Sequence, residues 1–263
     1  MKHNGILKNS IIIAAHPDDE LLWFGGILRD VDQIVLVYED FWPQPDVGQA
    51  RNAVLQDYPL DNVISLKVPE AATNGCADWD NPKIGDFGIE LGFEATLRDL
   101  KQQVKRVIGK SDAPAEGIET SYKKNYNLIY DRLKSILTPD MNVFTHNPWG
   151  EYGHEDHLQV YRVVEHLRQE IGFKQWMSNY CSERALPLAM TYFHNEEVKY
   201  FQVPVDKRFS NTVADVYHKH GCWTWAKDWK WFPFELYTEA PFAQSDETGQ
   251  PHLLPLNMFR LGE

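Results

Sequence analysis

Short apolar runs alternate with amphipathic stretches along the first two thirds of the chain. The run Ile11–Ala15 leads into a polar turn, and a helical pattern follows from residue 20. Apolar runs of this length are typical of strands that are buried on both faces. We expect strands at residues 10–15, 34–38, 63–68 and 142–145 and helices at 20–30, 48–58, 96–108, 122–137 and 157–170. This alternation predicts an α/β fold, Rossmann-like, with a mostly parallel sheet covered by helices on both faces.

The last third of the chain has a less regular pattern. We expect two further strands at 188–194 and 198–203, arranged as a hairpin, and a helix at 207–219. From residue 223 onward the chain is rich in aromatic residues, and its pattern predicts no element. The chain has 263 residues, of which 43% are hydrophobic, enough for one substantial core. We therefore expect a single domain over residues 1–263, on which the aromatic-rich segment of about 205–263 packs.

Composition narrows the classes of partner. A formal net charge of −12 argues against nucleic acid and anionic membranes, which are bound by basic surfaces. Three widely spaced cysteines, Cys76, Cys181 and Cys222, form neither a disulfide framework nor a CxxC motif, which favours the reducing cytoplasm. No segment approaches the ~18 apolar residues of a membrane span. We expect a cytoplasmic protein without integral membrane association.

Two chemically dense motifs follow predicted strands. The first, HPDDE, begins at His16, and the second, GHEDH, ends at His157. Because the carboxyl ends of parallel strands meet at one edge of a sheet, we expect both motifs at one site. Taken alone, a motif such as GHEDH is more often a solvated helix start than a metal site. The HPDDE motif is a stronger signal, because a buried strand that ends in three acids needs a compensating positive charge. Imidazoles and carboxylates without a thiol suit zinc or another divalent metal.

The two motifs resemble those of a known family. His16-Pro17-Asp18-Asp19-Glu20, with Gly25-Gly26 a turn later, is similar to the first motif of the PIG-L/LmbE-like zinc-dependent de-N-acetylases. Gly153-His154-Glu155-Asp156-His157, preceded by Asp140 and the strand at 143–146, is similar to the second. The resemblance covers residues 10–60 and 125–170. It implies a Rossmann-like hydrolase with one zinc per chain, or another divalent metal, that removes the N-acetyl group of an N-acetylglucosamine-type sugar conjugate by metal-activated water.

The resemblance also implies roles for individual residues. The metal ligands would be His16, Asp19 and His157. Asp18 would be the general base on the attacking water. His154 would stabilise the oxyanion or protonate the leaving amine, and Asp156 would orient His154. Tyr152 would approach the tetrahedral intermediate.

Two further residues are candidates for contacts to the sugar. Family members often carry an Arg followed closely by Glu after the second strand, but Asn52 follows Arg51 here. Arg51 is therefore expected either to face the sugar or to form a surface salt bridge. Trp149 lies between the predicted strand at 142–145 and the GHEDH motif. We expect its side chain either to stack on the sugar or to pack against its own loop. The segment 223–231 could be a strand, a lid or a dimer contact, so a homo-oligomer stays open.

Three alternative functions remain. The first is an amidase of the same family that acts on another acyl group or glycoside, such as a thiol conjugate or an antibiotic-like molecule. The second is a metal-containing protein that binds sugar without turnover. The third, a nucleotide-binding protein, is weak because the first strand ends in acids rather than in a Gly-rich phosphate turn. The expected partner is therefore a small-molecule amino-sugar conjugate.

Overall fold

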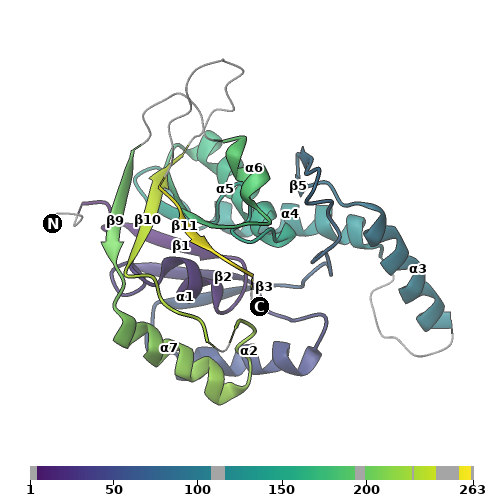
Figure 1. The fold of residues 1–263 in the computed structure, drawn as a ribbon, viewed down its shortest axis with the longest axis horizontal. Helices are drawn as coiled ribbons and strands as arrows, with labels where there is room; N and C mark the ends of the chain where they lie inside the picture. The colour runs from purple at the N-terminus through teal and green to yellow at the C-terminus, as the bar shows by residue number, and fades with distance from the viewer. Residues whose placement is uncertain (1–4, 108–115, 193–198, 227, 241–254, 262–263) are drawn as a thin grey trace.

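A seven-stranded sheet forms the centre of the computed structural model, which describes residues 5–107, 116–192, 199–226, 228–240 and 255–261 (Figure 1). The strand order is β3-β2-β1-β6-β7-β10-β9. The first five strands are parallel, and β10 is antiparallel to both of its neighbours. The bounds are β1 Ser10–Ala14, β2 Gln33–Tyr38, β3 Val63–Val68, β6 Asn142–Thr145, β7 Lys174–Ser178, β9 Tyr200–Pro204 and β10 Phe234–Glu239. The predicted α/β fold with a mostly parallel sheet is confirmed.

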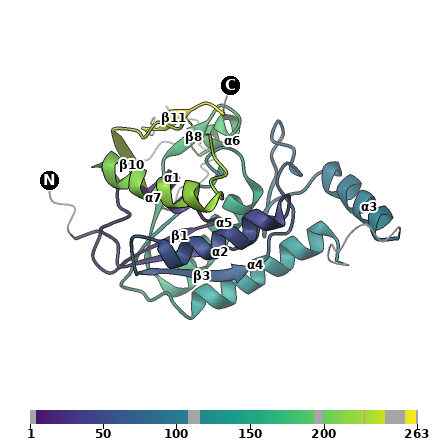
Figure 2. The same ribbon diagram turned by 90° about the horizontal axis from the view of Figure 1, so that it is seen from below.

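Helices cover both faces of this sheet, as Figure 2 shows. One core lies between the sheet and α1, α2 and α7, and another between the sheet and α4 and α5. The strand β1 serves both cores, because Ile12 and Ala14 enter the first while Ile11 and Ile13 enter the second. The helices are α1 Asp19–Phe24, α2 Pro45–Asp57, α4 Ile118–Lys134, α5 Glu155–Ile171 and α7 Lys207–His220. The apolar run of β1 thus reflects burial on both faces.

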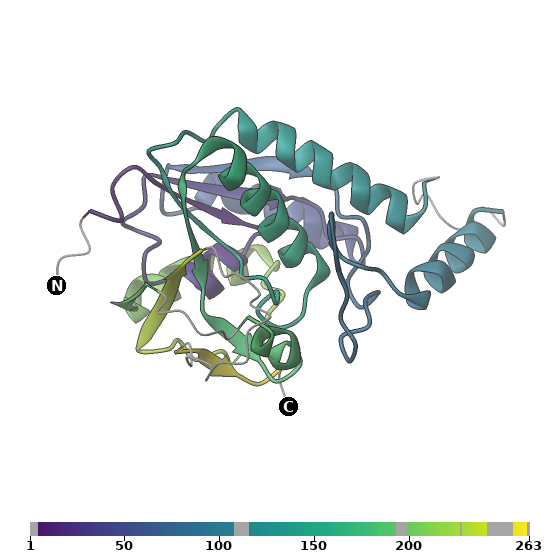
Figure 3. The ribbon, with the colours of Figure 1, turned by 90° about the horizontal axis from the view of Figure 1, so that it is seen from above.

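The remaining elements lie outside the central sheet. The helix α3, Phe93–Val107, lies away from the sheet beyond the end of α4 (Figure 3). Two short pairs of strands are β4 Ile84–Gly85 with β5 Gly88–Ile89, and β8 Tyr180–Ser182 with β11 Asn257–Phe259. No helix among the described residues combines the length and the apolar composition that a membrane crossing requires.

The C-terminal third differs most from the predicted elements. The strand expected at 188–194 is wrong, since the structure has the helix α6, Leu186–Met190, with Pro187 in its first turn. The expected strand at 198–203 exists as β9, but it pairs with β10 rather than with the preceding segment. Residues 193–198, between them, and most of the expected break at 109–117 lie outside the described residues.

The first helix is also shorter than expected. It ends at Phe24 instead of continuing to residue 30, and Gly25 and Gly26 follow it in a turn. At Gly25 a Cβ would lie 2.8 Å from the Leu21 carbonyl oxygen, and at Gly26 the carboxylate of Glu235 in β10 leaves little room for a side chain. A Cβ at Gly26 would lie 3.0 Å from Glu235 Oε2, which accepts a hydrogen bond from the Gly26 N–H at 2.7 Å. The C-terminal segment therefore packs directly on the end of α1.

Candidate active site

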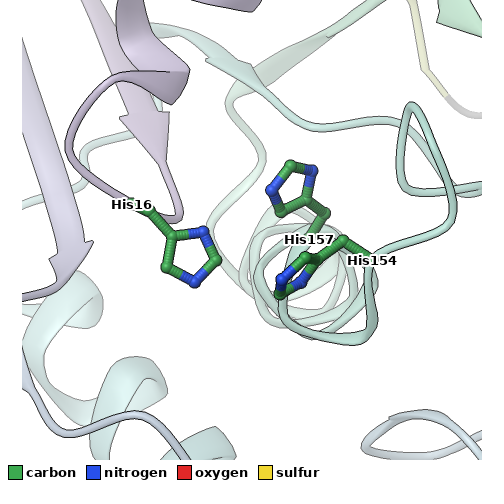
Figure 4. A group of neighbouring side chains, drawn as sticks. All are labelled: His16, His154 and His157. Atoms are coloured by element: carbon green, nitrogen blue, oxygen red, sulfur yellow. The ribbon is translucent and has the colours of Figure 1, made fainter. Parts of the chain in front are cut away.

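The two motifs lie at the same edge of the sheet because β1 and β6 are parallel neighbours. His16 lies in the turn after β1, and His154 and His157 lie at the start of α5, with the three rings facing a common space (Figure 4). Local hydrogen bonds shape the first turn. The N–H of His16 donates to Asp19 Oδ2 at 2.8 Å, and the N–H of Asp19 donates to the His16 carbonyl at 3.1 Å.

One carboxylate oxygen lies between two of these imidazoles. Asp19 Oδ2 is 3.0 Å from His16 Nδ1 and 3.1 Å from His157 Nε2. Although burial would raise it, the facing His157 and His16 hold the pKa of Asp19 well below its ordinary value. The buried Nε2 of His157 has no hydrogen-bond partner of suitable geometry among the described residues. A buried nitrogen in this state is costly unless another group meets its lone pair.

Glu151 and His146 belong to the same cluster, although the sequence analysis did not select them. Glu151 Oε2 lies 2.8 Å from His157 Nδ1 and 3.0 Å from His146 Nδ1. Burial would raise the pKa of Glu151, but His146 and His157 outweigh it and lower the pKa to about 2. His146 follows β6 as His16 follows β1, which is a signal the sequence does contain. For Glu151, an acid in a Gly- and Pro-containing loop, the sequence offers no such signal.

Two overlapping groups of side chains could hold a metal ion. They are His16, His154 and His157, and Asp19, His146 and His157, and within each group the ligand atoms lie within 4.8 Å of one another. His146 already uses both ring nitrogens, since the N–H of Ala15 donates to its Nε2 at 2.8 Å and its Nδ1 faces Glu151. The structure thus brings the three predicted ligands together and adds His154 and His146 to their surroundings.

Asp18 lies beside this cluster in a strained conformation, with φ of 101°. The hydroxyl of Thr224 donates to Asp18 Oδ2 at 2.7 Å, and the Thr224 N–H donates to the same oxygen at 3.3 Å. Burial raises the pKa of Asp18 to about 6, against the opposing effects of Arg51 and Thr224. The sequence analysis missed Thr224, because nothing in the local pattern around residue 224 links it to a turn near the N-terminus.

Asp156 makes different contacts from those expected. Its carboxylate contacts His16 rather than His154, with Oδ2 3.3 Å from His16 Nε2 and Oδ1 accepting from the Thr73 hydroxyl at 2.7 Å. The backbone N–H of Asp156 donates to His154 Nδ1 at 3.2 Å. Since Nδ1 of His154 accepts this hydrogen bond, the proton of the neutral ring lies on Nε2. Burial holds the pKa of His154 well below its ordinary value.

Tyr152 and Arg51 both line the cavity at this edge. The Tyr152 ring centroid is 5.2 Å from that of His157 and 5.5 Å from that of His154. Arg51 is 2% exposed, so the ion pair that it forms is buried and not at the surface. Its Nη1 donates to the Asp40 carbonyl at 2.9 Å and lies 3.4 Å from Glu70 Oε1. Glu70, which the sequence analysis did not select, is thus the acid that faces Arg51 in this structure.

Trp149 does not reach the cavity. Its side chain is 0% exposed, lies in a core with Leu158 and Met177, and donates from Nε1 to the Tyr180 carbonyl at 2.8 Å. A side chain enclosed on every side offers no face to a ligand, so the expected stacking on a sugar is corrected. The alternative expectation, packing of its own loop, agrees with these contacts.

A cavity of about 220 Å³ opens over the cluster. Its lining combines the two motifs with the loop after β2, the start of the loop after β3 and the C-terminal segment. The lining residues are His16, Asp18, Asp19, Phe41, Trp42, Arg51, Glu70, Asn74, Tyr152, His154, Asp156, Thr224 and Trp225. Burial raises the pKa of Glu70 to about 7. The arrangement presents imidazoles, carboxylates and one guanidinium in a small recess, as the hydrolysis of a polar substrate requires.

Comparison with known proteins finds no matching family model. Three curated relatives are each named 1D-myo-inositol 2-acetamido-2-deoxy-alpha-D-glucopyranoside deacetylase. The protein of Saccharomonospora viridis is 22% identical over 213 residues, which cover 78% of this chain and 75% of the relative. That of Corynebacterium diphtheriae is 24% identical over 177 residues, covering 62% and 53% of the two chains. That of Corynebacterium glutamicum is 24% identical over 161 residues, covering 59% and 50%.

The matches to the two Corynebacterium relatives thus span about half of those proteins, while the first match spans three quarters. All three names describe enzymes that hydrolyse an amide of an amino sugar. These relatives confirm the hydrolytic deacetylase predicted from HPDDE and GHEDH, and they confirm the resemblance of this chain to the PIG-L/LmbE-like de-N-acetylases.

Proposed function

We propose that this chain is a zinc-dependent hydrolase that removes the N-acetyl group from an N-acetylglucosamine-type sugar conjugate. The observation that carries the proposal is the buried Nε2 of His157. Asp19 Oδ2 lies 3.1 Å away, but no described residue offers this nitrogen a hydrogen bond of suitable geometry. A metal ion that accepts both atoms as ligands satisfies the nitrogen and the carboxylate together. The names of the relatives supply the class of substrate.

The donor set fits zinc. His16, Asp19 and His157 offer two imidazoles and one carboxylate, and a catalytic zinc site uses three such ligands and one open position. Burial would lower the pKa of His157, but Asp19 outweighs it and raises the pKa to about 9, so the surroundings favour a cation here. Glu151 and Asp156 orient His157 and His16 through their second ring nitrogens. When bound, zinc would supply an activated water and polarise the amide carbonyl.

The remaining polar residues would bind and move protons. Asp18 is the general base: its carboxylate takes a proton from the attacking water and returns it to the nitrogen of the leaving amine. Neutral His154 donates from Nε2 to the oxyanion, since its Nδ1 accepts from the Asp156 N–H. Tyr152 lines the same cavity and packs edge-on against the rings of His154 and His157. The overall reaction consumes one water and yields acetate and a free amine.

Arg51 is the proposed sugar contact. It lines the cavity, and its buried Nε has no partner among the described residues. An unpaired N–H in a cavity wall suits a hydroxyl group of the substrate. We propose the cytoplasm as location, since Cys76, Cys181 and Cys222 are all free and buried, as expected of thiols that a reducing compartment preserves.

The test combines metal analysis with acetate release from N-acetylglucosamine conjugates, each before chelation, after chelation and after the return of zinc. We expect about one metal per chain and activity that chelation abolishes and zinc restores. His157→Ala should lose the metal, whereas Asp18→Asn should keep the metal and lose turnover. His166→Ala, an exposed histidine of the same helix α5, is the control and should change neither.

Each result decides between the alternatives. Metal without acetate from any N-acetylated sugar would indicate another acyl group, another glycoside or sugar binding without turnover. If His157→Ala retained the metal content of the unmodified protein, the ligand set would be wrong. Full activity of Asp18→Asn would contradict its role as the base.

A further inference from the structure

We propose that two copies of this chain associate through α3, as an antiparallel pair of helices. The helix lies away from the central sheet, beyond the end of α4 (Figure 3). It lies outside the catalytic cavity, so the inference does not depend on the proposed function. The sequence leaves a homo-oligomer open, and the proposal assigns it one surface and one geometry.

Four apolar residues form a continuous stripe along α3, called here the α3 stripe. They are Phe93, Leu97, Leu100 and Val104, at intervals of four, three and four residues. Phe93 is 72% exposed, Leu100 52% and Val104 62%, while Leu97 is half-buried. None of the four belongs to a hydrophobic cluster of the described residues or packs against one. Large apolar side chains gathered on one exposed face are typical of an interaction surface.

The side of α3 that packs on the protein is opposite to this stripe. Ala95 is 6% exposed and packs with Ile118. Arg98 donates from Nη1 to the Asn74 carbonyl at 3.1 Å, and Asp99 accepts from the Ile118 N–H at 3.1 Å. At 3.6 residues per turn, Ala95, Arg98 and Asp99 lie about 130–170° around the helix from the centre of the stripe. A surface helix ordinarily buries its apolar face, so α3 has the orientation of a helix that covers this face with a partner.

The spacing of the α3 stripe is that of a two-helix coiled coil. Alternating intervals of three and four residues place its members at the d, a, d and a positions of a heptad. In an antiparallel pair, a positions meet d positions. Leu97 then meets Leu100 of the second copy, and Phe93 meets Val104 of the second copy, so each large ring faces a small side chain. The same surface serves both copies, as a twofold axis requires.

The charges beside the stripe select the antiparallel orientation. Glu94 and Lys101 lie exposed on one flank, and Thr96 and Gln103 lie exposed on the other. In an antiparallel pair each flank meets the same flank of the second copy, so Glu94 faces Lys101 twice. In a parallel pair each flank meets the opposite one, and these four residues form no oppositely charged pair. This self-complementarity identifies a second copy of the chain as the occupant of the stripe.

The size of the surface determines the expected strength. The helix has 15 residues and is therefore about 22 Å long. Two helices of this length bury less than the roughly 1,600 Å² of a standard stable interface, which places the contact among transient ones. We expect a dissociation constant on the order of 10–100 μM.

The test is sedimentation velocity of the purified full chain from about 1 μM to about 500 μM, at about 0.15 M salt. The unmodified protein should change from one to two chain masses over this range. Leu100→Glu places a charge at the centre of the stripe and should keep the protein monomeric throughout. Met190→Glu, at another large apolar position that is 59% exposed and lies outside α3, is the matched control and should dimerise like the unmodified protein. Equal melting temperatures would show that all three chains are folded.

Two charge variants test the orientation. Glu94→Lys makes the charged flank wholly positive, and Lys101→Glu makes it wholly negative. Each alone should weaken dimerisation by about fivefold or more, because two attractive pairs become repulsive. An equimolar mixture of the two variants should dimerise within about threefold of the unmodified protein, because opposite charges face each other again. A parallel pair would leave both single variants unchanged.

Each outcome supports or overturns the proposal. A protein that is monomeric at every concentration overturns it, and dimers that persist in Leu100→Glu place the contact on another surface. Dimers that Leu100→Glu abolishes but neither charge variant weakens overturn the antiparallel geometry. If the chain stays monomeric and binds phosphatidylcholine vesicles in a manner that Leu100→Glu abolishes, the stripe is a membrane contact and a second copy is not its occupant.

Discussion

The hydroxyl of Thr224 donates a hydrogen bond of 2.7 Å to Asp18 Oδ2, which joins two residues 206 positions apart in the sequence. Asp18 belongs to the HPDDE motif, whereas Thr224 belongs to the aromatic C-terminal segment, to which the family resemblance does not extend. Trp225 follows and packs against Tyr152 with ring centroids 4.9 Å apart. The cavity between the two motifs is thus lined in part by a segment outside the residues that carry the family resemblance.

This contact predicts that Thr224→Val lowers kcat. Valine keeps the shape but removes the donor, and a hydrogen bond to a charged group contributes about 1.5–3 kcal/mol, so kcat should fall by about tenfold or more. KM and the zinc content should stay near those of the unmodified protein, because Thr224 contacts neither ligand set. Thr224→Ser retains the hydroxyl and should recover most of kcat. Steady-state kinetics with metal analysis would decide, and an unchanged kcat for Thr224→Val would contradict the role.

The contact of Glu151 to His157 predicts that a Glu151 variant binds zinc more weakly. Since Glu151 Oε2 accepts from His157 Nδ1 at 2.8 Å, Glu151→Gln should weaken the orientation and basicity of this ligand. Loss of such a partner typically costs about 10- to 100-fold in metal affinity. Competition with a chelator at fixed pH measures this loss directly.

Glu20→Gln is the matched control for that measurement. Glu20 is as deeply buried and lies beside Asp19, but its Oε1 accepts from Tyr58 at 2.8 Å and Tyr217 at 2.7 Å, away from the imidazoles. Its zinc affinity should change by less than about threefold. Equal losses for the two variants would mean that burial of charge, and not the contact to His157, determines metal affinity.

The sequence predicted those parts of the site whose residues lie close together in the chain, in a short motif after a predicted strand. His16 and Asp19 follow one buried strand, and His157 follows another, so parallel pairing alone brings them together. By contrast, Glu151 contacts His157 from a loop in which Glu151 itself has a φ of 51°. No hydrophobic pattern encodes this backbone conformation. The contact of Thr224 to Asp18 depends on how the last third of the chain crosses the sheet edge. Such contacts follow from tertiary packing and leave no local signal.

The same reasoning explains the strands that were not predicted. The strand β7 contains Gln175 and Ser178, and β10 contains Glu235 and Thr238, all of them buried. Hydrophobic patterns identify strands by apolar residues on the buried face. Here Ser178 and Thr238 instead donate hydrogen bonds to buried acceptors, and Glu235 accepts hydrogen bonds from buried donors. Thr238, for example, donates to Asn179 Oδ1 at 2.8 Å. Buried polar residues therefore hide a strand from a pattern that counts apolar positions.

The free energy of unfolding of a Trp149 variant distinguishes a packing role of this side chain from a role in sugar binding. Because its side chain is fully enclosed, Trp149→Ala should lower the free energy of unfolding by about 3–5 kcal/mol through the cavity it creates. Denaturant unfolding measures this change. Trp42→Ala, at a position that is 36% exposed, should cost less than about 1.5 kcal/mol. The prediction of a packing role fails if Trp149→Ala keeps the stability of the unmodified protein and instead raises KM.

The last prediction concerns Glu235, which ties β10 to the end of α1. Its Oε2 accepts from the Gly26 N–H at 2.7 Å, its Oε1 accepts from the Tyr180 hydroxyl at 3.1 Å, and Tyr237 donates to it as well. Burial raises the pKa of Glu235 to about 7 from an ordinary value of 4.5, against the opposing effect of these hydrogen bonds. The folded protein therefore binds this proton more tightly than the unfolded chain does.

The sign of the pH effect follows from this difference. The stabilisation from the protonated carboxyl is fully present below about pH 4.5 and is lost as the pH rises through about 7. Between pH 5 and pH 8 the loss amounts to about 2–3 kcal/mol for a shift of this size. Glu235→Gln cannot ionise, so its free energy of unfolding relative to the unmodified protein should rise by that amount over this range. The free energy of unfolding of both zinc-saturated proteins is measured in urea at pH 5 and at pH 8. The difference between the two proteins removes the contribution of all titrating groups that they share. Glu119→Gln, at an exposed position, is the control and should show no such trend. If the stabilities of Glu235→Gln and the unmodified protein changed in parallel with pH, Glu235 would already be ionised at pH 5.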